Sequence, residues 1–206
     1  MRERKKERTR QALVDAALSL FAAKGFEATT IVEIAAAADV SPRTFFSYFE
    51  TKESVVFAGA PLKQEISGGV LAEPLPGERP AELLLRAFFS VLDADTDFVG
   101  EPQRIRTRLI MQSPSLQAFA LRQVLQGQRD LATGLLATFP GQVDETTAAA
   151  LSGALVGALV STLAALFADP ERAAELAVDP HRLRTEIERV TRAAFRSLGD
   201  ASVPLA

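Results

Sequence analysis

The residues best suited to binding chemistry lie between positions 41 and 52, where hydroxyl groups and cations follow one another closely. Arg43 can form a bidentate contact with a guanine edge or with a phosphate. The hydroxyl groups of Ser41, Thr44 and Tyr48 can each hold a phosphate oxygen. Lys52 stands where an ammonium and a backbone amide could bind one phosphate together. These groups predict a surface that binds a nucleic acid.

The composition excludes several other kinds of site. The 206-residue chain has no cysteine, so it has no disulfide, no thiolate metal site and no cysteine nucleophile. Its one histidine, His181, excludes a histidine-rich metal site. We therefore expect no enzyme activity, no metal and no cofactor. The net charge is −3, but residues 1–56 carry +1 and the rest −4, so a polyanion would bind the N-terminal part.

Two short helices separated by a tight turn are expected to position these groups. Residues 30–33 have the pattern of a capping box, which predicts a helix from 31 to 38. A serine–proline pair at 41–42 predicts a second helix from 42 to 48. Phe45 and Phe49, four residues apart, would pack inward and fix the angle of that helix. This layout predicts a helix-turn-helix, whose second helix enters the major groove of DNA.

Helix signals continue along the whole chain, and no stretch alternates convincingly with the period of a β-strand. The expected helices span 5–24, 31–38, 42–48, 52–72, 80–94, 102–111, 114–138, 143–168, 170–177 and 180–198. The sequence therefore predicts an all-α protein.

Many spaced positions in this N-terminal part match a known pattern without a gap. They are Ala16-Ala17, Leu20-Phe21, Gly25-Phe26, Thr29-Thr30, Ile34-Ala35, Val40-Ser41 and Thr44-Phe45-Phe46-x-Tyr48-Phe49-x-x-Lys52-Glu53. With these residues, positions 10–56 resemble the DNA-binding domain of the TetR family of bacterial transcriptional repressors. The resemblance implies a helix-turn-helix domain at 1–56 and a larger helical domain at 57–206 that binds an effector and forms a homodimer.

The resemblance also implies roles for particular residues. Positions that contact the phosphate backbone in the family correspond to Thr30, Thr44, Phe46, Tyr48 and Lys52. Positions that read bases correspond to Pro42, Arg43 and Ser47. The implied partners are double-stranded DNA with a near-palindromic operator and an unidentified small-molecule effector.

The sequence departs from the family pattern at a few positions. Asp39 replaces the usual glycine of the turn, and aspartate tolerates a left-handed conformation better than most residues. Phe46 replaces a usual tyrosine and lacks its hydroxyl. Ala36 and Ala37 stand where charged residues are common, so we expect more of the electrostatic binding from the basic N-terminal arm. The arm residues expected to contact DNA are Arg4, Lys5 and Arg8.

The C-terminal part must supply the dimer contact. Small residues in the uncharged stretch 146–168 allow close helix approach, and the last helix has an apolar face. The expected interface residues are Ala150, Gly153, Ala154, Gly157, Ser161, Ile187, Val190 and Ala194. The alternative is that both helices belong to the core of one subunit.

The effector pocket is expected among aromatic and aliphatic residues, most of which could equally be core. The candidates are Phe57, Phe88, Phe89, Leu92, Arg108, Met111, Phe119 and Val124. Arg108 is one of three alternating arginines, which together could be a solvated face. If Arg108 faces inward, it predicts an anionic or carboxylate ligand.

The uncharged stretch 146–168 is long enough to span a membrane, but no cluster of basic residues flanks it. No export signal follows the basic start of the chain. We therefore expect a cytoplasmic protein with no membrane partner. The function predicted from these features is a ligand-responsive, homodimeric DNA-binding regulator, most simply a repressor. The alternative is a DNA-binding structural or cell-division factor of the same fold with no small-molecule trigger.

Overall fold

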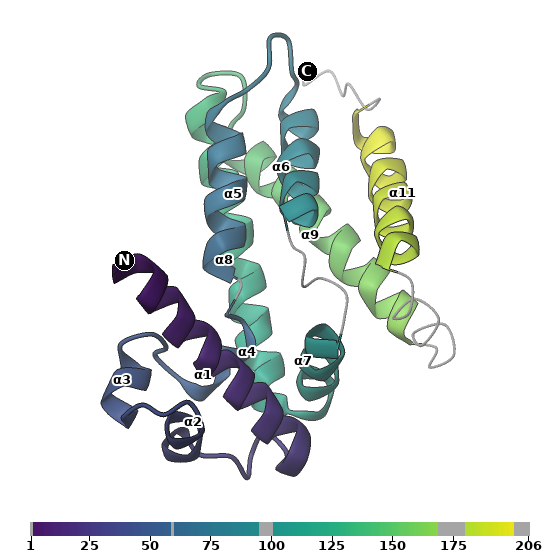
Figure 1. The fold of residues 1–206 in the computed structure, drawn as a ribbon. Helices are drawn as coiled ribbons and strands as arrows, with labels where there is room; N and C mark the ends of the chain where they lie inside the picture. The colour runs from purple at the N-terminus through teal and green to yellow at the C-terminus, as the bar shows by residue number, and fades with distance from the viewer. Residues whose placement is uncertain (1, 59, 95–100, 169–179, 200–206) are drawn as a thin grey trace. The chain divides into compact units, whose positions relative to one another are not determined.

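The computed structural model describes residues 2–58, 60–94, 101–168 and 180–199, and all regular structure within those ranges is α-helical (Figure 1). This confirms the expected all-α class. The helices are α1 (Arg2–Lys24), α2 (Ile31–Ala37), α3 (Pro42–Phe46), α4 (Lys52–Val56), α5 (Ala60–Ala72), α6 (Pro80–Ala94), α7 (Glu101–Gln112), α8 (Pro114–Thr138), α9 (Glu145–Phe167) and α11 (Pro180–Gly199).

The chain divides into two compact units. The first comprises Met1–Pro61 and Glu101–Arg122, and the second comprises Leu62–Gly100 and Gln123–Ala206. Compact units are defined by packing and functional domains by activity, so the expected domain boundary after residue 56 stays a prediction. The first unit does, however, include α7 and the start of α8 together with the N-terminal helices.

The core of the first unit forms around α1, which packs against α2, α4 and α7. Leu13, Phe21, Ile34 and Phe45 are almost completely buried in this core. Leu109 of α7 belongs to the same buried cluster. The spacing of apolar residues along α1 thus gives one helix face that holds several short helices in place.

The core of the second unit forms where α6, α9 and α11 pack together. Leu84, Leu135 and Phe195 are among its buried residues, and α5 joins it through Leu71. At that contact, a Cβ on Gly134 of α8 would lie 2.8 Å from the Leu71 Cδ1 atom. The threonine hydroxyl of Thr138 also donates to the Leu71 carbonyl at 2.6 Å.

The expected helix boundaries agree closely with the structure in most places, and α8 spans the expected residues 114–138. The expected single helix 52–72 is wrong, because the structure has α4 and α5 with a turn after Val56. Pro61 has no amide hydrogen to continue the hydrogen-bond ladder of α4, and it takes the second position of α5 instead. The expected helix at 170–177 lies outside the described residues.

Candidate nucleic-acid interface

The helix α2 begins with the capping box that the sequence predicts. The backbone amide of Glu33 donates to the Thr30 hydroxyl oxygen at 3.3 Å, and the Thr30 amide donates to Glu33 Oε2 at 2.8 Å. Lys24 adds an ion pair to the other carboxylate oxygen at 2.5 Å. This Lys24 hydrogen bond, followed by those from Thr30, lowers the pKa of Glu33 to about 2. The carboxylate therefore stays charged and ties the end of α1 to the start of α2.

The turn between α2 and α3 uses a left-handed residue. Asp39 has a φ of 55°, and it is the one non-glycine residue with positive φ in the described ranges. The amide of Val40 then donates to the Ala35 carbonyl at 2.9 Å, which closes the end of α2. The expectation that aspartate can replace glycine in this turn is confirmed.

The helix α3 is short, and aromatic rings on its buried side pack into the core. Phe45 is fully buried and Phe49 nearly so, with ring centroids 5.6 Å apart. Ser41 caps the helix, because its Oγ accepts from the Thr44 amide at 3.1 Å. A five-residue helix has too few internal hydrogen bonds to be stable alone, so these contacts fix its position.

The opposite face of α3 points to solvent. Pro42, Arg43 and Ser47 are exposed, and Phe46 is 56% exposed although its ring meets Phe45 edge-on at 5.6 Å. Thr44 and Tyr48 are half-buried beside them. The residues expected to read bases therefore share one exposed surface with residues expected to contact phosphates.

Three of the hydroxyl groups expected to contact phosphates already have partners within the chain. The Thr30 hydroxyl donates to Glu33 Oε2 at 2.8 Å, and the Ser41 and Thr44 hydroxyls lie 2.9 Å apart. Ser47 likewise donates to the Arg43 carbonyl at 3.2 Å. These hydroxyl groups support the helices first, and each oxygen retains acceptor or donor capacity for a second contact.

Lys52 lies in a different environment from the one that the sequence predicts. Its ammonium contacts the backbone carbonyls of Phe26, Thr29 and Glu27 at 2.8, 3.0 and 3.5 Å. It also lies 4.2 Å from the centre of the Phe26 ring. To reach a phosphate, the ammonium would have to leave these contacts, which join α4 to the loop after α1. Sequence reasoning missed this role because the partners lie 23 to 26 positions earlier in the chain.

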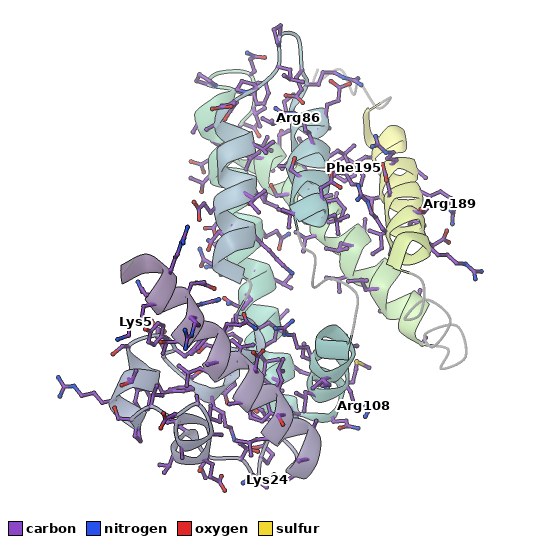
Figure 2. The ribbon with its side chains drawn as sticks, in the orientation of Figure 1. Lys5, Lys24, Arg86, Arg108, Arg189 and Phe195 are labelled. Atoms are coloured by element: carbon purple, nitrogen blue, oxygen red, sulfur yellow. The ribbon has the colours of Figure 1, made fainter. Side chains whose placement is uncertain are left out.

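The basic N-terminal segment is helical and not an extended arm. Residues 2–10 form the first turns of α1, with Arg4, Lys5 and Arg8 exposed. Lys5 is marked on this helix in Figure 2. Arg10 instead turns back toward Phe49, with its guanidinium 5.6 Å from the ring centre. An arm that enters the minor groove would be extended, whereas residues 2–10 are part of α1. The exposed cations therefore form a positively charged surface on this helix.

The comparisons with known proteins agree with this geometry. Residues 13–58 match the model for bacterial regulatory proteins of the tetR family. The HTH-type transcriptional regulator TcmR from Streptomyces glaucescens is 38% identical over 128 residues, which are 60% of this chain and 57% of that protein. The DNA-binding part of the chain therefore carries the tetR-family sequence pattern. The chain spans less than two thirds of the length of TcmR.

Solved structures extend the likeness of the fold beyond the N-terminal part of the chain. A transcriptional regulator from Aquifex aeolicus VF5 gives a TM-score of 0.50 at 16% identity and covers 90% of this chain and 96% of its own. The SmeT–triclosan complex gives a TM-score of 0.52 at 15% identity and covers 90% of each chain. At such identities the likeness shows a shared fold.

The expected effector residues fall into both compact units. Phe57 and Phe119 stack in the first unit with ring centroids 5.1 Å apart. In the same unit, Met111 is 70% exposed and Arg108 is exposed.

In the second unit, Val124 is half-buried. Phe88, Phe89 and Leu92 pack there around the fully buried Ile187, and the Arg192 guanidinium lies 4.4 Å from the centre of the Phe89 ring. The candidates thus divide between the two compact units.

The expected dimer residues also divide into two sets. Ala150, Gly157 and Ser161 are exposed on α9, and Ala154 is half-buried. Gly153 contacts its own chain, because a Cβ there would lie 2.6 Å from Gln128 Nε2. On α11, Val190 is half-buried and the side chain of Ala194 lies outside the described residues.

Ile187 does not fit an interface. Its side chain is 0% exposed in the single chain, where it packs between α6 and α9. A partner subunit could not reach it in this conformation. Its apolar spacing on α11 reflects the core of the subunit.

Proposed function

We propose that this chain is a ligand-responsive, homodimeric and cytoplasmic transcriptional repressor that binds a near-palindromic operator in double-stranded DNA. The observation that carries the proposal is the α3 surface, where Pro42, Arg43, Phe46 and Ser47 are exposed above buried Phe45. A rigid, exposed helix of this kind can enter the major groove, since its buried side fixes its orientation. The match of residues 13–58 to the tetR family model supports this use of the surface.

The proposed DNA contacts have two kinds of role. Arg43 is proposed to bind a guanine through its two guanidinium nitrogens, with Pro42 and Ser47 beside it. The backbone contacts would come from Thr30, Ser41, Thr44, Phe46 and Tyr48 around the helix and from Arg4, Lys5 and Arg8 on α1. For Lys52, the structure supports a backbone clamp more directly than a phosphate contact.

The dimer is proposed to form through α9. By length and composition, Glu145–Ala165 could cross a membrane, and only 22% of its apolar window is buried within the subunit. Ala150, Gly157 and Ser161 recur on its exposed side, and Val160 is 46% exposed there. A partner helix packed on this side would remove the apolar surface from water, which supports a soluble dimer over a membrane span.

The effector is proposed to be a small apolar or amphipathic molecule that binds the helical part beyond the DNA-binding domain. The structure of the SmeT neighbour as a complex with triclosan supports this proposal. Release would follow from a shift between two populations with different spacings of the two α3 helices. The alternative, a DNA-binding factor without a trigger, has no observation of its own in favour of it.

Arg43→Ala tests the proposed function. We expect the wild-type protein to protect a near-palindromic site in DNA upstream of its own gene, in a footprint at physiological salt. Arg43→Ala should weaken that site by about 1–3 kcal/mol while leaving binding to unrelated DNA almost unchanged. Arg129→Ala is the matched control, because Arg129 is exposed in the second unit, where its guanidinium donates to Gln126. Equal protection by wild type and Arg43→Ala would overturn the base-reading role.

A further inference from the structure

A cavity of about 530 Å³ lies within the first unit, between the C-terminal end of α1, the loop after it, and α7. This volume falls in the range of pockets that hold small organic ligands. One part of the wall is apolar and includes Ile105 and Leu109 of α7 with Phe21 of α1. The other part is polar and includes Lys24, Glu27, Arg108, Gln112 and Ser113. Figure 2 shows Lys24 at the end of α1 and Arg108 on α7.

The charged groups of the wall differ in whether they have partners. Lys24 is bound to Glu33 at 2.5 Å. Glu27 accepts hydrogen bonds from Ser113 Oγ at 2.9 Å and from Ser115 Oγ at 3.4 Å. Arg108 is exposed, and among the described residues it has neither a hydrogen bond nor an ion pair. The wall therefore holds one guanidinium without such a partner, Arg108, and one carboxylate, Glu27, whose Oε1 accepts both serine hydrogen bonds.

A lone guanidinium beside an apolar wall defines a ligand class. Its two parallel N–H groups match the two oxygens of a carboxylate, and this pairing is stronger than a neutral hydrogen bond. The apolar wall would bury a ring or short hydrocarbon body. The amide of Gln112 can donate to or accept from a further polar group. Arg108 is the cation of this wall that is available to such a ligand, since Lys24 is paired with Glu33.

We propose that this cavity binds a small amphipathic carboxylate, with its carboxylate on Arg108 and its apolar body against Ile105 and Leu109. The site lies in the unit that carries α2 and α3, and it includes Arg108, one of the residues expected to bind the effector. The inference therefore rests on the proposed function and gives the effector a chemical class. Its wall includes Phe26 and Glu27, whose carbonyls bind Lys52. An occupant would therefore contact the loop that joins α1 to the DNA-binding helices.

Isothermal titration calorimetry with 1-naphthoate tests the site on the full-length protein without DNA. The neutral 1-naphthamide has the same rings and serves as the ligand control. We expect naphthoate to bind with a dissociation constant in the millimolar range or below, and the amide to bind about tenfold more weakly. Arg108→Gln should weaken naphthoate about tenfold and leave the amide unchanged. Arg129→Gln, which removes an arginine of the second unit, should change neither.

A second variant tests the location independently of charge. Ala22 is exposed and lines the cavity, so Ala22→Phe should fill part of it and weaken naphthoate and naphthamide together. Circular dichroism would verify that each variant is folded. The proposal is overturned if naphthoate gives no binding heat, if Arg108→Gln binds it like the wild type, or if Ala22→Phe leaves its affinity unchanged. None of these outcomes depends on whether the protein binds an operator.

Discussion

The two compact units stabilise their helices in different ways. In the first unit, α2, α3 and α4 have seven, five and five residues, and each begins with a side-chain cap from Thr30, Ser41 or Thr51. In the second unit, α6, α9 and α11 have 15, 23 and 20 residues and pack against one another. Long helices gain most of their stability from a continuous apolar face, whereas short ones need a cap and a core anchor. The DNA-binding surface therefore depends on a few particular residues.

The difference also appears in what each unit leaves exposed. The first unit exposes single large apolar residues, such as Val32 and Phe46. The second leaves a row of small apolar residues along α9. Isolated exposed residues suit contacts with a groove, while a continuous apolar row suits contact with another helix. The surfaces proposed for DNA and for the partner subunit thus differ in kind.

The largest effect is expected from the aromatic anchor of α3. Phe45→Ala should lower the free energy of unfolding by about 3–5 kcal/mol, because it opens a cavity under a five-residue helix. Phe46→Ala is the matched control, since its ring is 56% exposed, and it should change stability by less than about 0.5 kcal/mol. Urea titrations of both variants would measure this. If both variants lost a similar amount of unfolding free energy, buried Phe45 would not be the residue that anchors α3.

A smaller effect is expected from the clamp between α4 and the loop after α1. Lys52→Met keeps the aliphatic stem but removes the contacts with three carbonyls, and it should lower the free energy of unfolding by about 1–3 kcal/mol. Lys5→Met removes an exposed lysine of α1 and should leave stability almost unchanged. In operator titrations against salt, Lys5→Met should reduce the slope and Lys52→Met should not. The reverse pattern would make Lys52 a phosphate contact.

The second unit has a comparable clamp in the loop between α5 and α6. Arg86 donates to both oxygens of Glu78 at 2.7 and 2.8 Å, and Glu78 also accepts from the Leu75 amide at 2.9 Å. The Arg86 hydrogen bonds lower the pKa of Glu78. Glu78→Gln should cost about 1–2 kcal/mol in chemical denaturation. Glu82→Gln, which breaks an exposed pair with Arg79, should cost under about 0.5 kcal/mol. If both variants lost the same unfolding free energy, the burial of the Glu78 carboxylate would add nothing to its pairing with Arg86.

The smallest effect is a pH dependence of the α2 cap. The pKa of Glu33 is about 2 in the folded chain against an ordinary value of 4.5. The stability that this carboxylate contributes should therefore be fully present above about pH 4.5 and be lost as the pH falls toward 2. The difference in unfolding free energy between wild type and Glu33→Gln should shrink across that window. Lys24→Met should raise the pKa of Glu33 and so narrow the pH range over which this stability is lost. If the difference in unfolding free energy between wild type and Glu33→Gln stayed the same down to pH 2, the Glu33 carboxylate would not stabilise the start of α2.

Much of the fold and of the interface was predictable from local sequence. The Thr30–Glu33 capping box, the turn at Asp39 and the inward aromatic pair of α3 all form as expected, because each involves residues no more than five positions apart. Other predictions failed where local pattern was ambiguous. The sequence pattern predicts one helix over residues 52–72, where the structure has α4 and α5. A proline near the start of a helix and a proline inside a helix cannot be told apart from the local pattern alone.

The sequence alone determined the helical class, the tetR-like pattern of the N-terminal part and the exposed face of α3, since these follow from periodicity, caps and a spaced motif. Only the tertiary structure decided that Lys52 contacts the loop after α1, that Ile187 is a core residue and that Arg108 lines a cavity with Ile105 and Leu109. The physical reason is the range of the interactions. Caps and turns act over three to five residues, whereas the partners of Lys52 and Ile187 are brought near only by the packing of helices far apart in the chain.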